Sequence, residues 1–364
     1  MENLPEAGLQ LSGKKIKAIS RDPEKTAAAI DLVHVHDTQP GISRIKNAKA
    51  FLYQHNGKKI KDKNTLQRIQ SLVIPPAWEQ VWICTLENGH LQATGIDTKQ
   101  RKQYRYHPHW NVFRNHTKYY RLIEFGNALP SIRQQLNKDL ALPGLPVEKV
   151  LALVVTLMEQ TNIRIGNNFY EKLYGSFGLT TLKDKHVDIK GNQIKFFFKG
   201  KKAVEHDITL KNKKLSALVK KCRDIPGKEL FQYYDDKGNR HPIDSGMVNN
   251  YIKKISGTDF SAKDFRTWWG SVQAFVAFTV LGSFETETEK KKKVVEALDM
   301  VAGHLGNTRT VCKKYYVHPV IITLYENNEL DKYINKTSGK KNADQPAAAI
   351  TPEEMALMKI LKSQ

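Results

Sequence analysis

The sequence predicts an α+β protein, with a small strand-rich N-terminal domain followed by a larger, mostly helical domain that contains a three-stranded sheet. Two observations support this fold class. In the first third of the chain, short segments in which apolar and polar residues alternate flank two Asn-Gly pairs, which is typical of strands joined by tight turns. In the rest, apolar residues recur at helical spacing, interrupted by one run of short alternating segments. The length of 364 residues fits one large domain or two ordinary ones.

The strand-rich domain is expected over residues 25–106, after a polar and basic arm at residues 1–24 that we expect to be mobile. Its alternating segments predict strands, and its only helical segment ends at a pair of prolines. The expected elements are strands at 41–45 and 49–60 with a turn at Asn56-Gly57, a helix at 63–78 ended by Pro75-Pro76, and strands at 79–97 around Asn88-Gly89.

The helical domain is expected over residues 107–330, and residues 331–364 have the composition of a linker with a short helix at its end. Residues 186–210 alternate and turn at Gly191-Asn192 and near Gly200, so they predict the three strands. The expected helices lie at 117–142 with interruptions, 146–160, 214–225, 246–256, 265–284 and 290–306.

The charge of the chain indicates a polyanionic partner. Lysine and arginine number 58 against 37 acidic residues, a net charge of +21. Each cation on a phosphate releases a condensed counterion, so such an excess favours nucleic acid. No apolar run is long enough to span a bilayer, and the first residues have no apolar core, so neither a membrane nor a secretory signal is expected. Three scattered cysteines favour a cytoplasmic protein.

Metal and nucleotide sites have little support in the sequence. "HVHD" at 34–37 and "HPH" at 107–109 contain metal ligands, but neither has a partner at ligand spacing. "FKGKK" at 198–202 lacks the glycine-rich loop and the hydroxyl residue of a phosphate-binding loop. We therefore expect no metal and no nucleotide cofactor.

A basic and aromatic segment, "KQRKQYRYHPHW" at 99–110, is a candidate nucleic-acid contact. If it is extended, Tyr104 and Tyr106 point to the same side. With the flanking cations, which include Arg101, they can contact a groove and its phosphates. The alternative is a basic edge strand.

Phosphodiester chemistry without a metal needs a nucleophile, cations for the phosphate oxygens and an acid for the leaving alkoxide. Tyrosine can be the nucleophile, and "CKKYYVHP" offers Tyr315 and Tyr316. Arginine is suited to bind phosphate, and Arg164 and Arg266 both stand in apolar settings. Either arginine alone is equally consistent with an ion pair in the core.

These segments, in their order, resemble the type IB DNA topoisomerases, in particular the bacterial and poxvirus-like branch. The resemblance covers about residues 30–325. It rests on "RKQYRYHP", "NIRIGN", "FGLTTLKDKHVDI", "FKGKK", "KDFRTWWG" and "HLGNTRTVCKKYYVHP". The sequence departs from the family pattern at Gln100, where glycine is common, and at Arg309, where proline is common.

The resemblance implies five catalytic residues. The family's first arginine falls on Arg164, its hairpin lysine on Lys201 and its second arginine on Arg266. A histidine or asparagine stands nine residues before the nucleophile. Nine before Tyr316 is Asn307, which can donate to phosphate, whereas nine before Tyr315 is a glycine, so Tyr316 is the expected nucleophile.

The resemblance also implies a mechanism and a partner. Tyr316 forms a 3′-phosphotyrosyl link, the free strand swivels, and religation needs neither ATP nor metal. The expected partner is double-stranded DNA, gripped by a monomer. Gln103, Tyr104 and Tyr106 fall on the family's "QYxY" contacts to the major groove.

Two other functions remain open at this point. Tyrosine recombinases share the chemistry but usually carry H-x-x-R, where this chain has "KDFR" with Lys263 in place of the histidine. We include Lys263 among the expected DNA contacts. A non-catalytic nucleoid or RNA-binding protein explains the charge equally well.

Overall fold

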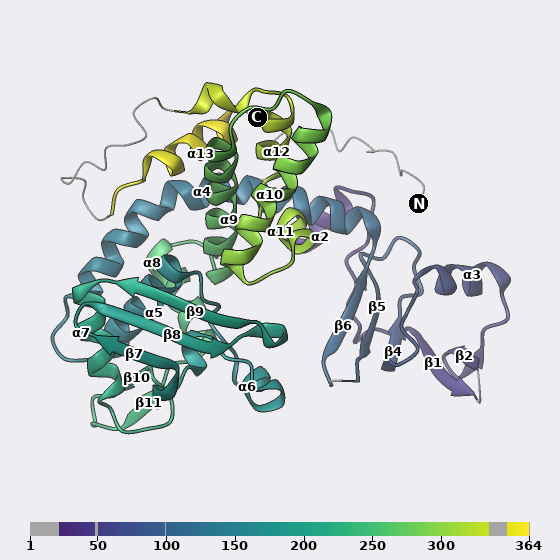
Figure 1. The fold of residues 1–364 in the computed structure, drawn as a ribbon. Helices are drawn as coiled ribbons and strands as arrows, with labels where there is room; N and C mark the ends of the chain where they lie inside the picture. Colours follow the sequence, from purple (N-terminus) through teal and green to yellow (C-terminus); the bar gives the residue numbers. More distant parts are fainter. Residues whose placement is uncertain (1–21, 48–49, 99, 335–347, 364) are drawn as a thin grey trace. The chain divides into compact units, whose positions relative to one another are not determined.

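The computed structural model describes residues 22–47, 50–98, 100–334 and 348–363 (Figure 1). The chain divides into two compact units, Met1–Arg121 and Leu122–Gln364, which we call unit 1 and unit 2. The division lies 15 residues after the expected boundary at residue 106, inside helix α4 (Pro108–Leu140). Most of the expected N-terminal arm lies outside the described residues, and Asp22 caps a short helix, α2 (Pro23–Ala28).

Unit 1 contains the predicted strands. They form one antiparallel sheet of order β3-β2-β1-β4-β5-β6. Its elements after α2 are β1 (Ile42–Asn47), β2 (Ala50–His55), β3 (Lys58–Lys59), α3 (Lys63–Ser71), β4 (Glu79–Ile83), β5 (Leu91–Ile96) and β6 (Lys102–Tyr106).

The first Asn-Gly turn is confirmed and the second is different. Asn56 and Gly57 have φ of 49° and 76°, the conformation that a two-residue hairpin turn requires. Asn88 and Gly89 instead lie in a longer connection between β4 and β5, where Gly89 bridges to Val33. Ile69 of α3 covers one face of the sheet.

Unit 2 is mostly helical and contains the predicted three-stranded sheet, of order β7-β8-β9. Its helices after α4 are α5 (Val147–Thr161), α6 (Asn168–Tyr174), α7 (Lys213–Arg223), α8 (Ser245–Ser256), α9 (Ala262–Leu281), α10 (Glu287–Leu305), α11 (Arg309–Tyr315), α12 (Pro319–Glu326) and α13 (Pro352–Lys362). Its strands and short 3-10 helices are η1 (Leu179–Thr181), η2 (Asp184–His186), β7 (Val187–Lys190), β8 (Gln193–Lys199), η3 (Lys201–Ala203), β9 (Glu205–Lys211), β10 (Gln232–Tyr234), β11 (Arg240–Pro242) and η4 (Leu330–Tyr333).

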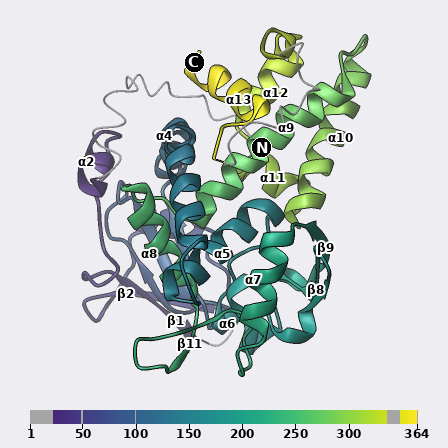
Figure 2. The ribbon, with the colours of Figure 1, turned by 90° about the vertical axis from the view of Figure 1, so that its left-hand side faces the viewer.

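Helix α5 lies in the centre of the core of unit 2. Its apolar residues from Val150 to Met158 are almost completely buried. Figure 2 shows α7 and α8 on either side of it, and it also contacts α9. The C-terminal end of α5 is therefore fixed by the core of unit 2, and the segment that follows it starts from a rigid helix.

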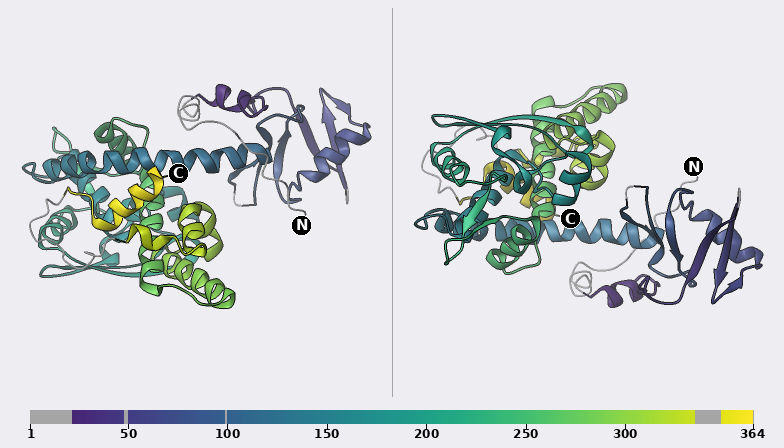
Figure 3. Two further views of the ribbon diagram at one scale, coloured as in Figure 1. Left: turned by 90° about the horizontal axis from the view of Figure 1, so that it is seen from above. Right: turned by 90° about the horizontal axis from the view of Figure 1, so that it is seen from below.

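Helix α4 is longer and more regular than the sequence predicts. It continues through Pro130 for 33 residues, as both views of Figure 3 show along its length. Its C-terminal part contributes Leu122, Phe125 and Leu129 to the core of unit 2. No helix among the described residues is long and apolar enough to cross a membrane.

The end of the chain is not linker-like where the structure describes it. Helix α13 buries Leu357, Ile360 and Leu361 in the core of unit 2. Its Glu354 accepts two hydrogen bonds from Arg133 of α4 and one from Trp268 of α9. The short helix expected at the end of residues 331–364 is therefore confirmed as α13, whereas its packing on the core was not predicted, because local composition does not reveal a partner surface.

Candidate active site

Arg164 is placed by the segment that follows α5. Asn162 ends the helix in the left-handed conformation, and the neighbours Ile163 and Ile165 are buried in the core. In extended backbone alternate residues point to opposite sides, so burial of the two isoleucines turns Arg164 away from the core. The carbonyl of Arg164 also accepts a hydrogen bond from Leu179, which fixes this backbone to η1.

Arg266 reaches the same place from α9. Its guanidinium donates to the carbonyl of Leu305 at 2.8 Å and to the carbonyl of Asn162. Arg164 donates to the carbonyl of Gly306 at 3.1 Å and to Oδ1 of Asn307 at 2.6 Å. The two arginines therefore meet at the C-terminal end of α10 and the turn that follows it.

The two arginines form a cationic site in which Arg266 is buried and Arg164 is half-buried. Arg266 is 6% exposed, and burial lowers its pKa, which Tyr316 partly opposes. Burial, and then the charge of Arg266, lower the pKa of Arg164 to about 10. Among the described residues, neither guanidinium pairs with a carboxylate. Two adjacent cations, Arg266 buried and Arg164 half-buried, without a counter-ion favour the binding of an anion.

Two buried donors at this site have no partner among the described residues, namely Nε of Arg266 and Nδ2 of Asn307. Since Oδ1 of Asn307 already accepts from Arg164, the amide nitrogen is the atom of that side chain that remains to bind a ligand, and it is a donor. A buried donor without an acceptor is unfavourable, so both are set to bind an acceptor from outside the chain. An anion with several oxygens, such as phosphate, satisfies these donors and both charges.

Tyr316 is the tyrosine that lies beside Arg266. The Arg266 guanidinium carbon is 5.3 Å from the centre of its ring. The Tyr316 backbone packs closely on Gly270, one turn after Arg266 on α9, and its carbonyl accepts from the Ser271 hydroxyl at 3.2 Å. Tyr315 is instead 39% exposed, with Lys314 over its ring.

Our sequence prediction missed Gly270 and Ser271. Ser271 also accepts a hydrogen bond from the backbone of His318, so it holds the chain on both sides of Val317. The signal that was available is spacing, because a residue four after Arg266 lies on the same face of a helix.

Lys201 makes no hydrogen bond or ring contact with Arg164, Arg266, Asn307 or Tyr316 in the described part of the chain. It is exposed in η3, the turn between β8 and β9, and its amine is 6.0 Å from the ring centre of Tyr170. Lys202 and Ala203 have positive φ of 62° and 59°, so the turn is conformationally strained. The structure thus brings together Arg164, Arg266, Asn307 and Tyr316, and it does not place the Lys201 side chain in contact with them.

The expected DNA contacts of unit 1 lie on β6. Tyr104 and Tyr106 stack with ring centres 5.9 Å apart, so they share a side as expected. Tyr104 is 47% exposed, whereas Tyr106 packs partly against the core. Arg101 pairs with Asp97 at 2.6 Å, and the amide of Gln103 donates to the same carboxylate at 2.9 Å. Of these four side chains, Tyr104 is the most available to a ligand.

Lys263 and the two departures from the family pattern also have defined places. Lys263 is exposed on α9, one turn before Arg266. Gln100 has a φ of 54°, the left-handed conformation that favours glycine. Arg309 starts α11 and makes two hydrogen bonds to the Asp299 carboxylate of α10, at 2.7 and 2.5 Å.

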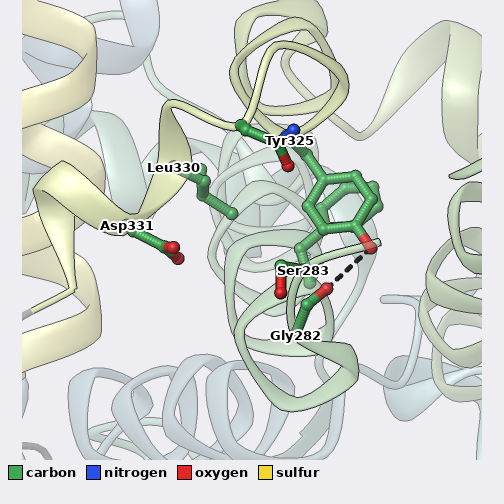
Figure 4. Close-up of a pocket in the computed structure, with 7 residues that line it drawn as sticks. Gly282, Ser283, Tyr325, Leu330 and Asp331 are labelled. Carbon is green, nitrogen blue, oxygen red and sulfur yellow. Dashed lines mark hydrogen bonds between the residues drawn. The ribbon is translucent and has the colours of Figure 1, made fainter. Parts of the chain in front are cut away.

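The remaining cavities and histidines do not suggest a second reactive centre in the described part of the chain. No three His, Cys, Asp or Glu side chains gather there in a metal-binding arrangement. His34 of the "HVHD" segment instead stacks on His90, with ring centres 4.2 Å apart. The cavity between Gly282 and Tyr325 in Figure 4 holds about 10 Å³, no more than one water. A wider and open cavity of about 390 Å³ is lined by Arg309, Thr310, Lys313 and Lys314 of α11.

Known proteins resemble both parts of the chain. Residues 99–342 match a family model described as the catalytic core of eukaryotic DNA topoisomerase I. Residues 50–97 match one described as the N-terminal domain of bacterial DNA topoisomerase IB.

Viral proteins are similar over most of their length. DNA topoisomerase 1B of Acanthamoeba polyphaga mimivirus is 32% identical over 297 residues, which are 79% of this chain and 88% of that protein. DNA topoisomerase I of monkeypox virus is 25% identical over 269 residues, which are 72% of this chain and 80% of that protein. The catalytic-core model covers more than half of the chain, across the whole of the site described above. The chain belongs to the type IB DNA topoisomerase family.

Proposed function

We propose that the chain relaxes supercoiled duplex DNA by cutting and resealing one strand, with Tyr316 as the nucleophile. The observation that carries this proposal is the convergence of Tyr316 with the buried Arg266 and the half-buried Arg164, neither of which pairs with a carboxylate in the described chain. The unpartnered amide nitrogen of Asn307 lies at the same place. A phosphodiester placed there meets a nucleophile and donors for its non-bridging oxygens at once.

In the cleavage step, the Tyr316 Oη attacks the phosphorus and forms the O–P bond of a 3′-phosphotyrosyl ester. The P–O5′ bond breaks, and the hydroxyl proton of Tyr316 passes to solvent. Arg164, Arg266 and Asn307 stabilise the charge on the non-bridging oxygens. The ester retains the bond energy, so the reverse attack by the 5′-hydroxyl reseals the strand without ATP after the free end has swivelled.

Lys201 is proposed to give its proton to the leaving O5′ oxygen. Lysine can act as a general acid when it is positioned at the leaving group. Lys201 is on an exposed hairpin turn, so its amine is accessible to a DNA strand bound at the arginine site. A substrate with sulfur in place of the 5′ oxygen tests the role, because a thiolate leaves without a proton. The sulfur substrate should be cleaved by Lys201→Ala at close to the parent rate. Slow cleavage of the sulfur substrate by this variant would contradict the role of Lys201 as the acid.

Plasmid relaxation in EDTA without ATP tests the proposed activity. Purified protein should produce stepwise relaxed topoisomers, Tyr316→Phe should abolish them, and Tyr315→Phe, as the matched control, should retain them. Relaxation by Tyr316→Phe together with its loss in Tyr315→Phe would show that Tyr315 is the nucleophile instead. DNA binding without relaxation by the parent protein would favour the non-catalytic alternative.

We further propose that unit 1 binds the same duplex through the β6 side chains, with Tyr104 in the major groove, and that the protein acts as a monomer on DNA in the cytoplasm. The exposed Tyr104 and the net charge of +21 support the DNA contact. A tyrosine recombinase is less favoured, since Lys263 stands where those enzymes usually carry histidine. Relaxation of plasmids without a shared target site separates the two classes.

A further inference from the structure

His206 links the hairpin that carries Lys201 to the arginine site. It is the second residue of β9 and lies opposite Phe198 of β8 in the strand register. The two rings stack with centres 4.9 Å apart and planes inclined by 19°. The ring of His206 therefore has a fixed position on the hairpin, five residues after Lys201.

Two glycines leave the space that this ring fills. A Cβ atom built on Gly200 would lie 2.6 Å from Nε2 of His206, and one built on Gly306 would lie 2.6 Å from Cε1. Both distances are shorter than real Cβ contacts, so the ring is in tight contact with both backbones. Gly200 directly precedes Lys201, and Gly306 directly precedes Asn307.

The same place is close to the reacting site. The Cβ position of Gly306 is 3.7 Å from Nη1 of Arg164, and the Gly306 carbonyl accepts from Arg164. Burial, and then the charges of Arg164 and Arg266, lower the pKa of His206, so the ring is neutral near pH 7. In the described part of the chain, no hydrogen bond involves its ring nitrogens. The ring thus acts by its shape, as a spacer between two segments.

We infer that His206 is a positioning residue for the cleavage step, which holds the Lys201 hairpin at its working distance from the Arg164–Asn307 site. The inference rests on the proposed function, in which Lys201 is the acid for the leaving oxygen. If the ring is removed, the hairpin loses its contact with the Gly306 turn, and the acid is misplaced while the phosphate site remains.

The test is single-turnover cleavage of two DNA substrates, one with the natural 5′ oxygen at the scissile bond and one with sulfur. His206→Ala should slow cleavage of the oxygen substrate by about 10- to 100-fold, because a misplacement near 1 Å has that effect. It should cleave the sulfur substrate within about threefold of the parent rate, since a thiolate needs no acid. An equal loss on both substrates, or no loss on either, overturns the inference.

Further variants test whether the ring acts by holding the hairpin in place. In a Lys201→Ala background, His206→Ala should add less than about threefold, because both changes remove the same contribution. His206→Phe keeps a flat ring but has no titratable nitrogen, so it should cleave the oxygen substrate faster than His206→Ala does. A rate no higher than that of His206→Ala would contradict the role of the ring as a spacer. His186→Ala is the control, because it removes a buried histidine elsewhere in unit 2. If it also slows cleavage of the oxygen substrate but not of the sulfur substrate, the inference is overturned.

Failure of the proposed function is visible in the same experiment. If sulfur does not rescue Lys201→Ala itself, the acid assignment fails. If it rescues Lys201→Ala and not His206→Ala, the positioning role fails while the assignment of Lys201 stands.

Discussion

A methyl group added at Gly270 should slow DNA cleavage while leaving the fold intact. Gly270 lies on α9, one turn after Arg266, and its Cβ position is 2.9 Å from the carbonyl oxygen of Tyr316 and 3.1 Å from the Tyr316 Cβ. Both neighbours are close to the backbone of the proposed nucleophile, so neither can turn away as the end of a flexible side chain can. Gly270→Ala therefore displaces Tyr316 relative to Arg266.

The structure sets the size of this effect. To reach ordinary contact at 3.4 Å, the Tyr316 carbonyl must move by about 0.5 Å. Since a 1 Å misplacement of a reacting group lowers the rate by about 100-fold, we expect a loss of about tenfold. The stability should fall by about 0–2.5 kcal/mol, because overpacking costs about 1–3 kcal/mol and alanine recovers about 0.5–1 kcal/mol through its higher helix propensity.

The assay is single-turnover formation of the covalent protein–DNA complex, followed on a denaturing gel, with thermal unfolding measured in parallel. Gly303→Ala on α10 is the matched control, since its Cβ would meet nothing within 4 Å. The control should cleave at the parent rate and unfold at a slightly higher temperature. Parent-like cleavage by Gly270→Ala would refute the tight contact between α9 and Tyr316 as a determinant of the rate.

Three other predictions concern stability. Gln100→Gly should stabilise the protein by about 0.5–1 kcal/mol in urea unfolding, because it relieves a left-handed residue; destabilisation would contradict the turn conformation. Glu354→Ala should destabilise by about 1–3 kcal/mol by the same measurement, because it removes the bidentate partner of the half-buried Arg133, which keeps Glu159, and a change below about 0.5 kcal/mol would contradict that account. Burial, and then His34, lower the pKa of His90 to about 4, against an ordinary value of 6.5. The neutral His90 ring accepts a hydrogen bond from the Val35 amide, so about 3 kcal/mol of stability present above pH 6.5 should be lost as the pH falls toward 4. NMR titration of His90 checks this, and a pKa near 6.5 would contradict it.

Local signals in the sequence predicted most of the elements. The Asn56-Gly57 hairpin and the sheet around Gly191 followed from turn residues between alternating segments. The unbroken helix α4 did not, because Pro130 locally favours an interruption. The packing of helix α13 was not predicted, since its burial depends on α9 and α12, and its Glu354 accepts from Arg133, 221 residues earlier in the chain.

The candidate site was predictable to a different degree. Resemblance placed Arg164, Arg266, Asn307 and Tyr316 at matching positions, and these four lie together in the structure. The pairing of Arg101 with Asp97 was not foreseen, because a charge that is four residues away contacts its partner only when the turn has the right geometry.

Two contacts of the site depend on tertiary approach. Gly270 and His206 both pack against backbone from distant segments. The spacing of Gly270 from Arg266 places it on the right helix face, but its contact with Tyr316 and the contact of His206 with Gly306 are visible only once the space around each glycine is known.

The most direct test of the central claim is to identify the amino acid that carries the DNA. The covalent complex is trapped with detergent on a short duplex, digested with nuclease and protease, and the adduct peptide is sequenced by mass spectrometry. We expect a nucleotide joined through its 3′-phosphate to Tyr316. An adduct on Tyr315 or on any other residue would contradict the account of the site.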